Sequence, residues 1–280
     1  MRIRDKIIST LDSIPSLPTA AIKAVKMLQD PDVSISRLTK TIEYDPALTS
    51  NVLRLANSAY FGANRQIESL RQAIVRLGTN NVFRLVVASA VAPLSSQAVK
   101  GYDIPPGELW AHSVAVAITS ENLRVELNLD APGYIFTAAL LHDLGKIVLG
   151  NFGELDVEAI LKTAKEREVS FDEAEMAVLG IDHAEVGAVL LEKWNLPKTI
   201  SEAVRWHHYP KYFPNDPIAI DLIHVGDNLC IKMGIGIGID GLKHRVSNES
   251  VERLKMSNRI AEKVLLKTMG DLNEFRTMFN

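Results

Sequence analysis

The chain has 280 residues, enough for one large domain or two modest lobes with a substantial core. Its formal net charge of −3 gives no surplus of Lys and Arg for binding nucleic acid. The single cysteine, Cys230, cannot form an internal disulfide, which excludes a disulfide-dependent secreted scaffold. The N-terminus has no signal-peptide pattern, and no apolar run approaches the roughly 20 residues that span a bilayer. These features predict a cytoplasmic protein that binds neither a membrane nor nucleic acid.

Apolar residues recur at helical spacing along nearly the whole chain, and no sustained stretch alternates apolar with polar residues. The predicted fold class is therefore all-α. In the first part, we expect helices to begin at Pro18, after Ser34 and after Asp45, where proline or a capping side chain favours a helix start. A further helical stretch, residues 69–92, is interrupted at Gly78, which suits a left-handed helix end.

Residues 93–106 break the helical pattern with prolines, paired serines and a glycine, and we interpret them as the connection between two lobes. The predicted organisation is an N-terminal helical lobe over residues 1–100, a second lobe over 101–245 and a C-terminal helical extension over 246–280. The second lobe should contain a long helix at about 107–127, followed by shorter helices that begin near Pro132, Ser170, Asp182 and Pro197 and at about residue 216.

The stretch Ala-Ala-Leu-Leu-His-Asp-Leu-Gly-Lys at 138–146 places an imidazole and a carboxylate in strongly apolar surroundings. Because burying either group unpaired costs several kcal/mol, His142 and Asp143 need compensation. One interpretation is a metal ion, with the Lys146 ammonium free for an anionic oxygen. The alternative needs no metal: His142 caps a buried carbonyl, and Asp143 pairs with Lys146 three residues on.

Several ordered motifs together resemble the HDOD domain of bacterial signalling proteins. They are Ile-Pro-Ser-Leu-Pro at 14–18, Asp-Pro-Ala-Leu at 45–48, Leu-Ala-Asn-Ser at 55–58, Gly62, Ala-Ile-Val-Arg-Leu-Gly at 73–78 and Leu-Leu-His-Asp-Leu-Gly-Lys at 140–146. The resemblance covers about residues 10–230, and the last motif matches its HD-superfamily half. It implies a two-lobed helical fold and a bacterial signal-transduction or regulatory role.

The resemblance also implies a metal site, because further residues match the successive ligand positions of HD-type phosphohydrolases. The implied metal ligands are Glu108, His112, His142, Asp143, His183, His207, His208 and Asp227. The implied catalytic groups are Asp143 and Lys146, the latter stabilising charge on a phosphate. Glu108 and His112 share a helix face four residues apart, although an exposed, solvated Glu108 is an equal alternative.

Charge favours a binuclear site, because five neutral imidazoles and three carboxylates balance two divalent cations and a bridging hydroxide. Iron, manganese, zinc and nickel all suit these ligand types. One departure matters: the double histidine is followed by Tyr-Pro-Lys-Tyr-Phe-Pro, and not by the glutamate and Gly-Tyr-Pro loop of HD-GYP phosphodiesterases. This argues against hydrolysis of a cyclic dinucleotide.

Other polar residues have simpler interpretations. His224 and Cys230 flank Asp227 and suit core packing or support of that carboxylate, while His244 should be solvated. The formal match Gly236-x-Gly238-x-x-Gly241 to a dinucleotide-binding loop follows a helix without a βαβ unit, so a mobile loop is favoured.

Three functional hypotheses remain. The favoured one is a regulatory module that binds signalling proteins or a phosphate-containing small molecule and holds a metal. The runner-up is a metal-dependent phosphohydrolase acting on a nucleotide or cyclic nucleotide. The third is a helical adaptor with coincidental histidines and no metal.

Overall fold

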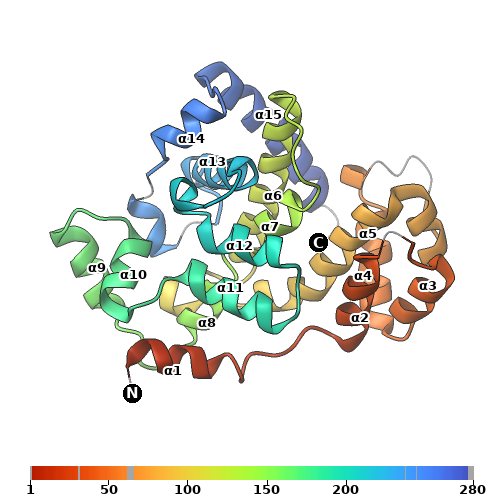
Figure 1. Cartoon of the computed structure of the whole chain (residues 1–280), viewed down its shortest axis with the longest axis horizontal. Coiled ribbons are helices and arrows are strands. Elements are labelled where there is room, and N and C mark those ends of the chain that lie inside the picture. The colour runs from red at the N-terminus through yellow and green to blue at the C-terminus, as the bar shows by residue number, and fades with distance from the viewer. Residues whose placement is uncertain (1, 31, 62–65, 237, 244, 277–280) are drawn as a thin grey trace.

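The computed structural model describes residues 2–30, 32–61, 66–236, 238–243 and 245–276. Helices make up the regular structure of these residues, and their only β-pairing is a single bridge between Val99 and Ile104. The all-α prediction is therefore confirmed. Figure 1 shows two helical lobes side by side, with the earlier helices α2 to α5 in one and most later helices in the other.

The N-terminal lobe consists of α2 (Thr19–Leu28), α3 (Ile35–Glu43), α4 (Pro46–Ala56) and α5 (Leu70–Ser95). Its helix starts follow from local side-chain caps. The Ser34 hydroxyl accepts the Arg37 N–H, and the Asp45 carboxylate accepts the Leu48 N–H at 3.0 Å. Helices α2 and α4 both pack against α5, which forms the centre of this lobe.

Helix α5 is divided at Gly78, whose φ of 77° and ψ of 166° lie outside the helical range, as the sequence predicted. The helix continues through Pro93 to Ser95, slightly beyond the predicted break. By length and composition alone α5 could cross a membrane. However, its apolar residues are partly buried between α2 and α4, and the kink at Gly78 interrupts it, which are features of a core helix.

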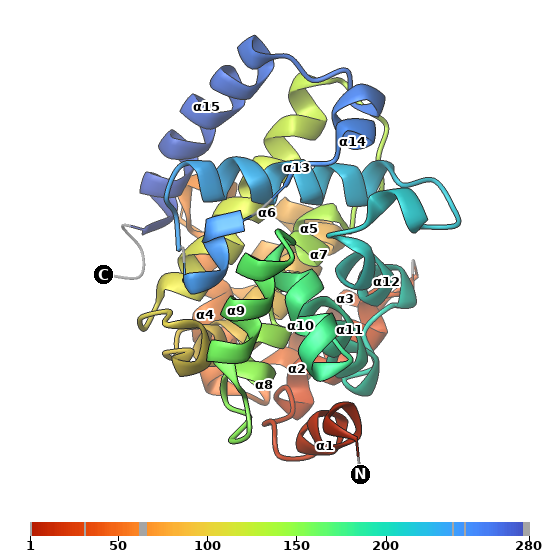
Figure 2. The same cartoon turned by 90° about the vertical axis from the view of Figure 1, so that its left-hand side faces the viewer.

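The second lobe is built around α6 (Glu108–Glu126), α7 (Ile135–Leu141) and α13 (Ile218–Lys232), which pack against one another. The other helices of this lobe are α8 (Gly145–Gly150), α9 (Val157–Glu166), α10 (Phe171–Leu179), α11 (His183–Lys193) and α12 (Lys198–Trp206). Figure 2 shows α13 lying across this lobe, above α8 to α12. Helix α10 begins after Ser170, as the sequence predicted, and Ser170 and Glu173 form a capping box at its start.

The helix predicted to begin near Pro132 corresponds to α7, which ends at Leu141, so His142 and Asp143 lie in the turn before α8. The turn allows α8 to cross α11 closely. A Cβ on Gly145 would lie 1.9 Å from the His183 carbonyl oxygen, so only glycine fits there. This crossing brings the His142–Asp143 turn close to the start of α11.

The two ends of the described chain pack onto the second lobe. Helix α1 (Ile3–Thr10) lies below α8 and is joined to α2 by an extended segment (Figure 1). Helix α14 (Asn248–Arg253) packs on α13, and α15 (Asn258–Arg276) packs along α6. The domain limits at 100 and 245 stay predictions.

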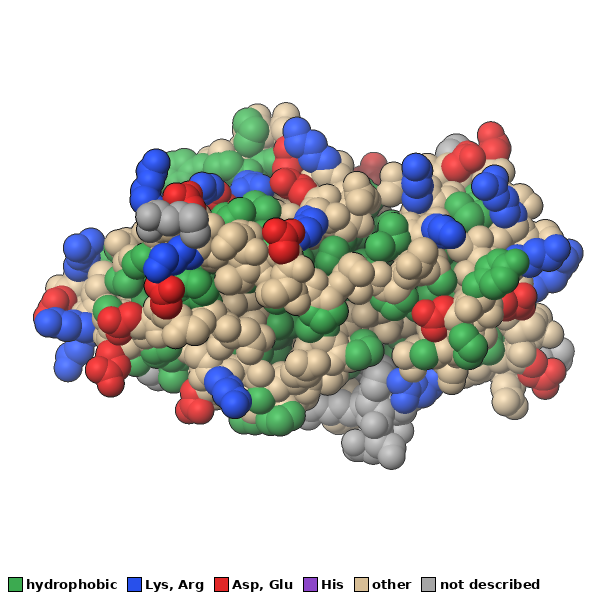
Figure 3. Space-filling model, turned by 90° about the horizontal axis from the view of Figure 1, so that it is seen from below, with side chains coloured by type: hydrophobic (Ala, Val, Ile, Leu, Met, Phe, Trp, Pro, Cys, Tyr) green, Lys and Arg blue, Asp and Glu red, His purple; other side chains and the backbone are tan. Residues whose placement is uncertain are grey.

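The surface carries both signs of charge. On the face seen in Figure 3, Lys and Arg are interspersed with Asp and Glu, and no histidine is visible. Short 3₁₀ turns join several helices of the second lobe, namely η2 (Lys100–Tyr102), η3 (Pro210–Tyr212) and η4 (Ile239–Lys243).

Candidate metal centre

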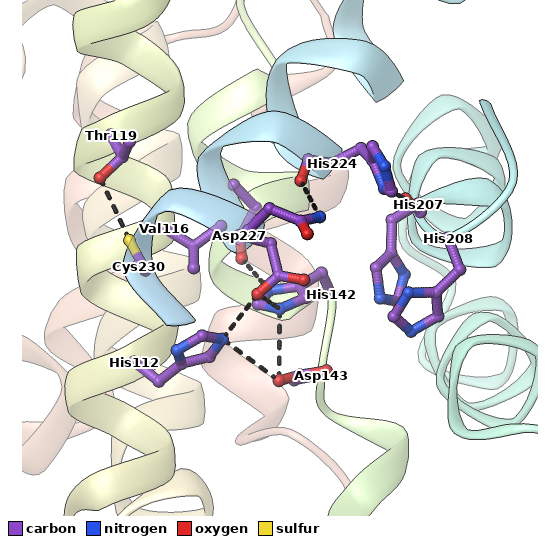
Figure 4. Close-up of polar contacts among 12 residues, drawn as sticks. His112, Val116, Thr119, His142, Asp143, His207, His208, His224, Asp227 and Cys230 are labelled. Atoms are coloured by element: carbon purple, nitrogen blue, oxygen red, sulfur yellow. Dashed lines mark hydrogen bonds and ion pairs between the residues drawn. The ribbon is translucent and has the colours of Figure 1, made fainter. Parts of the chain in front are cut away.

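Seven of the predicted site residues converge between the helices of the second lobe. They come from five places: His112 from α6, His142 and Asp143 from the α7–α8 turn, His183 from the first position of α11, His207 and His208 from the end of α12, and Asp227 from α13. All are buried except His208, which is half-buried. Figure 4 shows His112, His142, Asp143 and Asp227 pointing toward one another, with His207 and His208 beside them.

One group consists of His112, His142 and Asp227, whose ligand atoms all lie within 4.8 Å of one another. The Asp227 Oδ1 is 3.0 Å from the His112 Nε2 and 3.7 Å from the His142 Nε2. The Asp143 Oδ2 faces the same two rings, at 3.5 Å from His112 and 3.3 Å from His142.

A second group consists of His183, His207 and His208. The Asp143 Oδ1 lies 3.4 Å from the His183 Nε2, so the two oxygens of Asp143 face different groups. The Nε2 atoms of His183 and His208 are 2.8 Å apart. Two nitrogen lone pairs at this distance repel each other, so a proton or a cation has to lie between them.

The imidazoles are oriented by hydrogen bonds from their other ring nitrogen. In each case Nδ1 faces an oxygen that can only accept, so Nδ1 carries a proton and Nε2 is directed toward the cluster. The acceptors are the carbonyl of Ile235 for His112 (3.0 Å), of Ala139 for His142 (2.7 Å) and of Val204 for His207 (2.7 Å), and the Glu175 carboxylate for His183 (2.8 Å).

Two of the Nε2 atoms lack the hydrogen bonds that the Nδ1 atoms make. The Nε2 atoms of His142 and His207 are buried and lack a hydrogen bond. Burial, together with the positive fields of His142 and His183, lowers the pKa of His207 well below its usual value, so the ring is neutral. A neutral imidazole with an unshared Nε2 lone pair is the form that binds a metal ion.

The carboxylates are also in their metal-binding form. Burial alone would raise the pKa of Asp143 and Asp227, but the neighbouring histidines, and Lys146 in the case of Asp143, lower both well below the usual value. Both groups are therefore ionised. The cluster as a whole offers lone pairs and negative charge in a largely buried site.

The profile of the HDOD domain family matches residues 14–210. The chain belongs to the HDOD family. The resemblance predicted from the sequence motifs is thus confirmed, and with it the two-lobed helical fold of HDOD proteins.

The individual relatives have low sequence identity to this chain. An uncharacterized protein of Treponema pallidum (strain Nichols) is 27% identical over 221 residues, which make up 77% of this chain but 41% of that protein. An HDOD domain protein with unknown function from Geobacter sulfurreducens superposes with a TM-score of 0.71 at 25% identity, covering 98% of this chain and 93% of that one. A candidate phosphohydrolase from Shewanella amazonensis SB2B superposes with a TM-score of 0.73 at 24% identity, covering 98% of both chains.

The ammonium of Lys146 is paired in this HDOD chain, whereas the sequence predicted it to be free. Its ammonium was predicted to be free for an anionic oxygen, but it is buried and donates to Asp143 at 2.7 Å and to Asp240 at 2.5 Å. Both contacts of the metal-free alternative therefore exist, since His142 also donates to a buried carbonyl. They do not exclude a metal, because they use the Nδ1 of His142 and leave its Nε2 facing the cluster.

Glu108 is the predicted ligand that the structure does not bring into the cluster. It lies half-buried in the first turn of α6, one turn before His112, and the described contacts do not join its side chain to the other site residues. His224 lies beside the site, but its Nδ1 donates to the His207 carbonyl and its Nε2 accepts the Ser247 N–H. The contact of Cys230 with Thr119 is likewise one of core packing (Figure 4).

The glycine-rich loop has a packing role that the sequence did not suggest. Gly236 has a φ of 64°, and a Cβ there would lie 2.5 Å from both the Glu108 carbonyl oxygen and the His112 Cβ. The loop also supplies the Ile235 carbonyl to His112 and the Asp240 carboxylate to Lys146. Its described part is therefore fixed against the candidate site, in contrast to the mobile loop favoured from sequence; Ile237 and His244 lie outside the described residues.

Sequence reasoning missed three buried side chains next to the cluster: Tyr102, Glu175 and Asp240. Glu175 accepts from His183, and Asp240 accepts from Lys146. An acidic residue within an apolar helix face, as Glu175 is in α10, was the one available signal.

Proposed function

We propose that this HDOD protein is a regulatory module whose second lobe holds two divalent cations. The observation that supports this most directly is that two groups of three ligands lie on either side of Asp143, with one carboxylate oxygen facing each. One ion would be held by His112, His142 and Asp227, and the other by His183, His207 and His208. Asp143 would contribute to both.

Energetics favour filling this site. A buried polar group without a hydrogen bond costs about 1–3 kcal/mol, and the Nε2 atoms of His142 and His207 have no hydrogen bond. A bound cation would give both nitrogens a partner. It would also stabilise the fold, because an ion that binds only the folded state stabilises that state. We propose iron, manganese, zinc or nickel, because all accept imidazole together with carboxylate.

Metal analysis of protein purified without chelator tests the proposal. We expect about two equivalents of divalent metal in the wild-type chain, and a clear loss in His142→Ala and Asp143→Ala. His224→Gln is the matched control, because His224 is as buried as the ligands but both its nitrogens bind backbone groups. Wild-type protein without metal, or His142→Ala and Asp143→Ala variants with full metal content, would contradict the proposal.

The role of Glu108 is decided in the same experiment. As a ligand it would have to turn toward His112 from its half-buried position in the first turn of α6. If Glu108 belongs to the set, Glu108→Gln lowers the metal content as the other ligand variants do. A Glu108→Gln chain with full metal content identifies it as a solvated side chain.

We propose that the regulatory role is exerted through a signalling protein or a phosphate-containing small molecule that contacts the chain. This rests on membership of the HDOD family. The mixed charge of the surface in Figure 3 suits a protein surface or a small anion more than a long polyanion.

Metal-dependent hydrolysis of a phosphoester is the second candidate, and His208 favours it. His208 is the one half-buried member of the cluster, so the group that includes it is the side that solvent can approach. The Shewanella amazonensis structure that bears the name of a candidate phosphohydrolase shares the fold. When bound, divalent cations supply Lewis acidity toward a phosphoryl oxygen and activate water.

In this candidate function, the chain's own residues have defined tasks. Asp143 orients toward both groups, and Lys146 holds Asp143 in place through a hydrogen bond of 2.7 Å. The catalytic roles of Asp143 and Lys146 stay predictions. Screening the metal-loaded wild-type chain against nucleotides, cyclic nucleotides and simple phosphodiesters separates the candidates: turnover that is lost in Asp143→Asn supports hydrolysis, and full metal content without turnover supports the regulatory module.

A further inference from the structure

Glu175 is a fully buried carboxylate on α10 that is surrounded by donors. Its Oε2 accepts the backbone N–H of His183 at 2.9 Å and the Nδ1–H of the same residue at 2.8 Å. Its Oε1 accepts the hydroxyl of Tyr102 from the η2 turn. A buried carboxylate is costly unless its oxygens are hydrogen-bonded, and here three donors compensate it.

This arrangement fixes the start of α11 and the His183 ring together. Gly180, with a φ of 73°, ends α10 and turns the chain, and the Asp182 carboxylate then accepts the Glu185 N–H as the helix cap. Glu175 takes the next free donor, the N–H of His183. Because the same oxygen also accepts from Nδ1, the His183 Nε2 is directed toward Asp143 and His208.

His183 differs in this respect from the other three oriented histidines. The Nδ1 atoms of His112, His142 and His207 donate to neutral backbone carbonyls, whereas that of His183 donates to a carboxylate. A carboxylate partner makes the opposite ring nitrogen a stronger base and a better metal ligand than a carbonyl does. The group that contains His183 therefore has a ligand whose basicity is raised by a carboxylate outside the ligand set. The group of His112, His142 and Asp227 has no such ligand.

We propose that Glu175 is a positioning residue for the ion held by His183, His207 and His208, and that this ion depends on Glu175 while the other does not. The inference rests on the proposed function, since it assigns a dependence to one of the two ions. Tyr102 supports Glu175 from the far side. Its hydroxyl is not needed to orient His183, because both His183 contacts use the other oxygen.

The test is a titration of metal-free protein with Zn²⁺ against a competing chelator, for the wild type, Glu175→Gln and Tyr102→Phe. Glu175→Gln keeps the shape and an acceptor oxygen for His183 but removes the negative charge. In Glu175→Gln we expect the ion held by His183, His207 and His208 to bind about 10–100-fold less tightly than in the wild type. The affinity for the other ion should stay unchanged. Tyr102→Phe, the matched control, should bind both ions within a few-fold of the wild type.

A spectroscopic measurement on the metal-free chains accompanies the titration. The ¹⁵N shifts of the His183 ring should show a protonated Nδ1 in the wild type and in Tyr102→Phe. An unprotonated Nδ1 in the wild type overturns the inference whatever the metal content. Because this measurement needs only the wild-type chain, it tests the inference even if Glu175→Gln fails to fold.

The two proposals fail in different ways. A wild-type chain that takes up no ion overturns the proposed function, and with it the dependence on Glu175. A wild-type chain that takes up two ions, together with a Glu175→Gln variant that matches it in both affinities, overturns only the inference about Glu175.

Discussion

Lys146 is a buried cation shared by two carboxylates from distant parts of the chain. Burial alone would lower the pKa of Lys146, but Asp143 and Asp240 raise it above its usual value, so the ammonium stays charged. It balances the charge on Asp143 and ties the glycine-rich loop, through Asp240, to the turn that carries His142. Its position makes it a structural part of the candidate site.

Replacing this ammonium should be far more costly than removing a surface charge. Lys146→Met keeps most of the apolar stem but leaves two buried carboxylates unbalanced, and we expect a loss of about 3–5 kcal/mol in the free energy of unfolding. Urea denaturation at a fixed metal content measures it. Lys162→Met is the control, since the exposed Lys162–Glu166 pair at 3.9 Å should contribute at most about 1 kcal/mol. Similar losses in both variants would contradict the assignment.

Cys230 provides a pH-dependent prediction. Burial between α13 and α6 raises the pKa of its thiol from 9.0 to about 12. The folded state thus holds this proton more tightly than the unfolded state, so the stability contributed is complete below pH 9 and is lost as the pH rises toward 12. Denaturation of the wild type and Cys230→Ala across this range should show a shallower alkaline decline in the variant. Parallel declines would rule this contribution out.

At the scale of elements, the crossing of α8 and α11 determines the shape of the site. Gly145 and Gly187 meet there, and a Cβ on Gly145 would lie 1.9 Å from the His183 carbonyl oxygen and 2.7 Å from the Gly187 nitrogen. These are backbone atoms and cannot rotate away. The crossing therefore couples the His142–Asp143 turn, directly before α8, to the first residue of α11.

Two glycine substitutions should have opposite effects. Gly145→Ala forces the two helices apart, and we expect a loss of about 1–3 kcal/mol together with weaker metal binding. Gly270→Ala, in an exposed part of α15 with open space around the position, should raise stability by up to about 1 kcal/mol. Thermal unfolding and metal titration of both variants check this; a tolerated Gly145→Ala would show that the crossing can relax.

At the scale of the whole molecule, α1 holds the extended N-terminal segment against the second lobe. Ile7 and Leu11 are buried there, and ion pairs join Arg4 to Glu185, Lys6 to Glu154 and Asp12 to Lys193. The chain then continues through residues 11–18 to α2 in the N-terminal lobe. This segment therefore links the two lobes in addition to the connection after α5 (Figure 1).

Apolar burial should dominate this contact. Ile7→Ala removes a fully buried side chain, and we expect it to lower the free energy of unfolding by about 2–5 kcal/mol. Arg4→Ala breaks an ion pair whose arginine is 46% exposed, with an expected cost of no more than about 1 kcal/mol. Chemical denaturation compares the two, and an equal or larger effect for Arg4→Ala would show that charge, and not burial, holds α1.

Local signals in the sequence predicted much of the fold. Capping side chains such as Ser34 and Asp45, the interruption at Gly78 and the capping box at Ser170 all act within four residues, so they can be found without knowing the rest of the structure. The ordered motifs placed the chain in its family. The resemblance also supplied the types of residue at the candidate site.

The surroundings of those residues were decided only by the tertiary structure. The contact between Lys146 and Asp240 spans 94 positions, and that between His112 and the Ile235 carbonyl spans 123. Packing alone brings these atoms together, because burial requires every polar group to find a partner wherever the fold places one. For this reason the sequence named most of the imidazoles and carboxylates, whereas the pairing of Lys146, the position of Glu108 and the part played by Glu175 depended on how the helices pack.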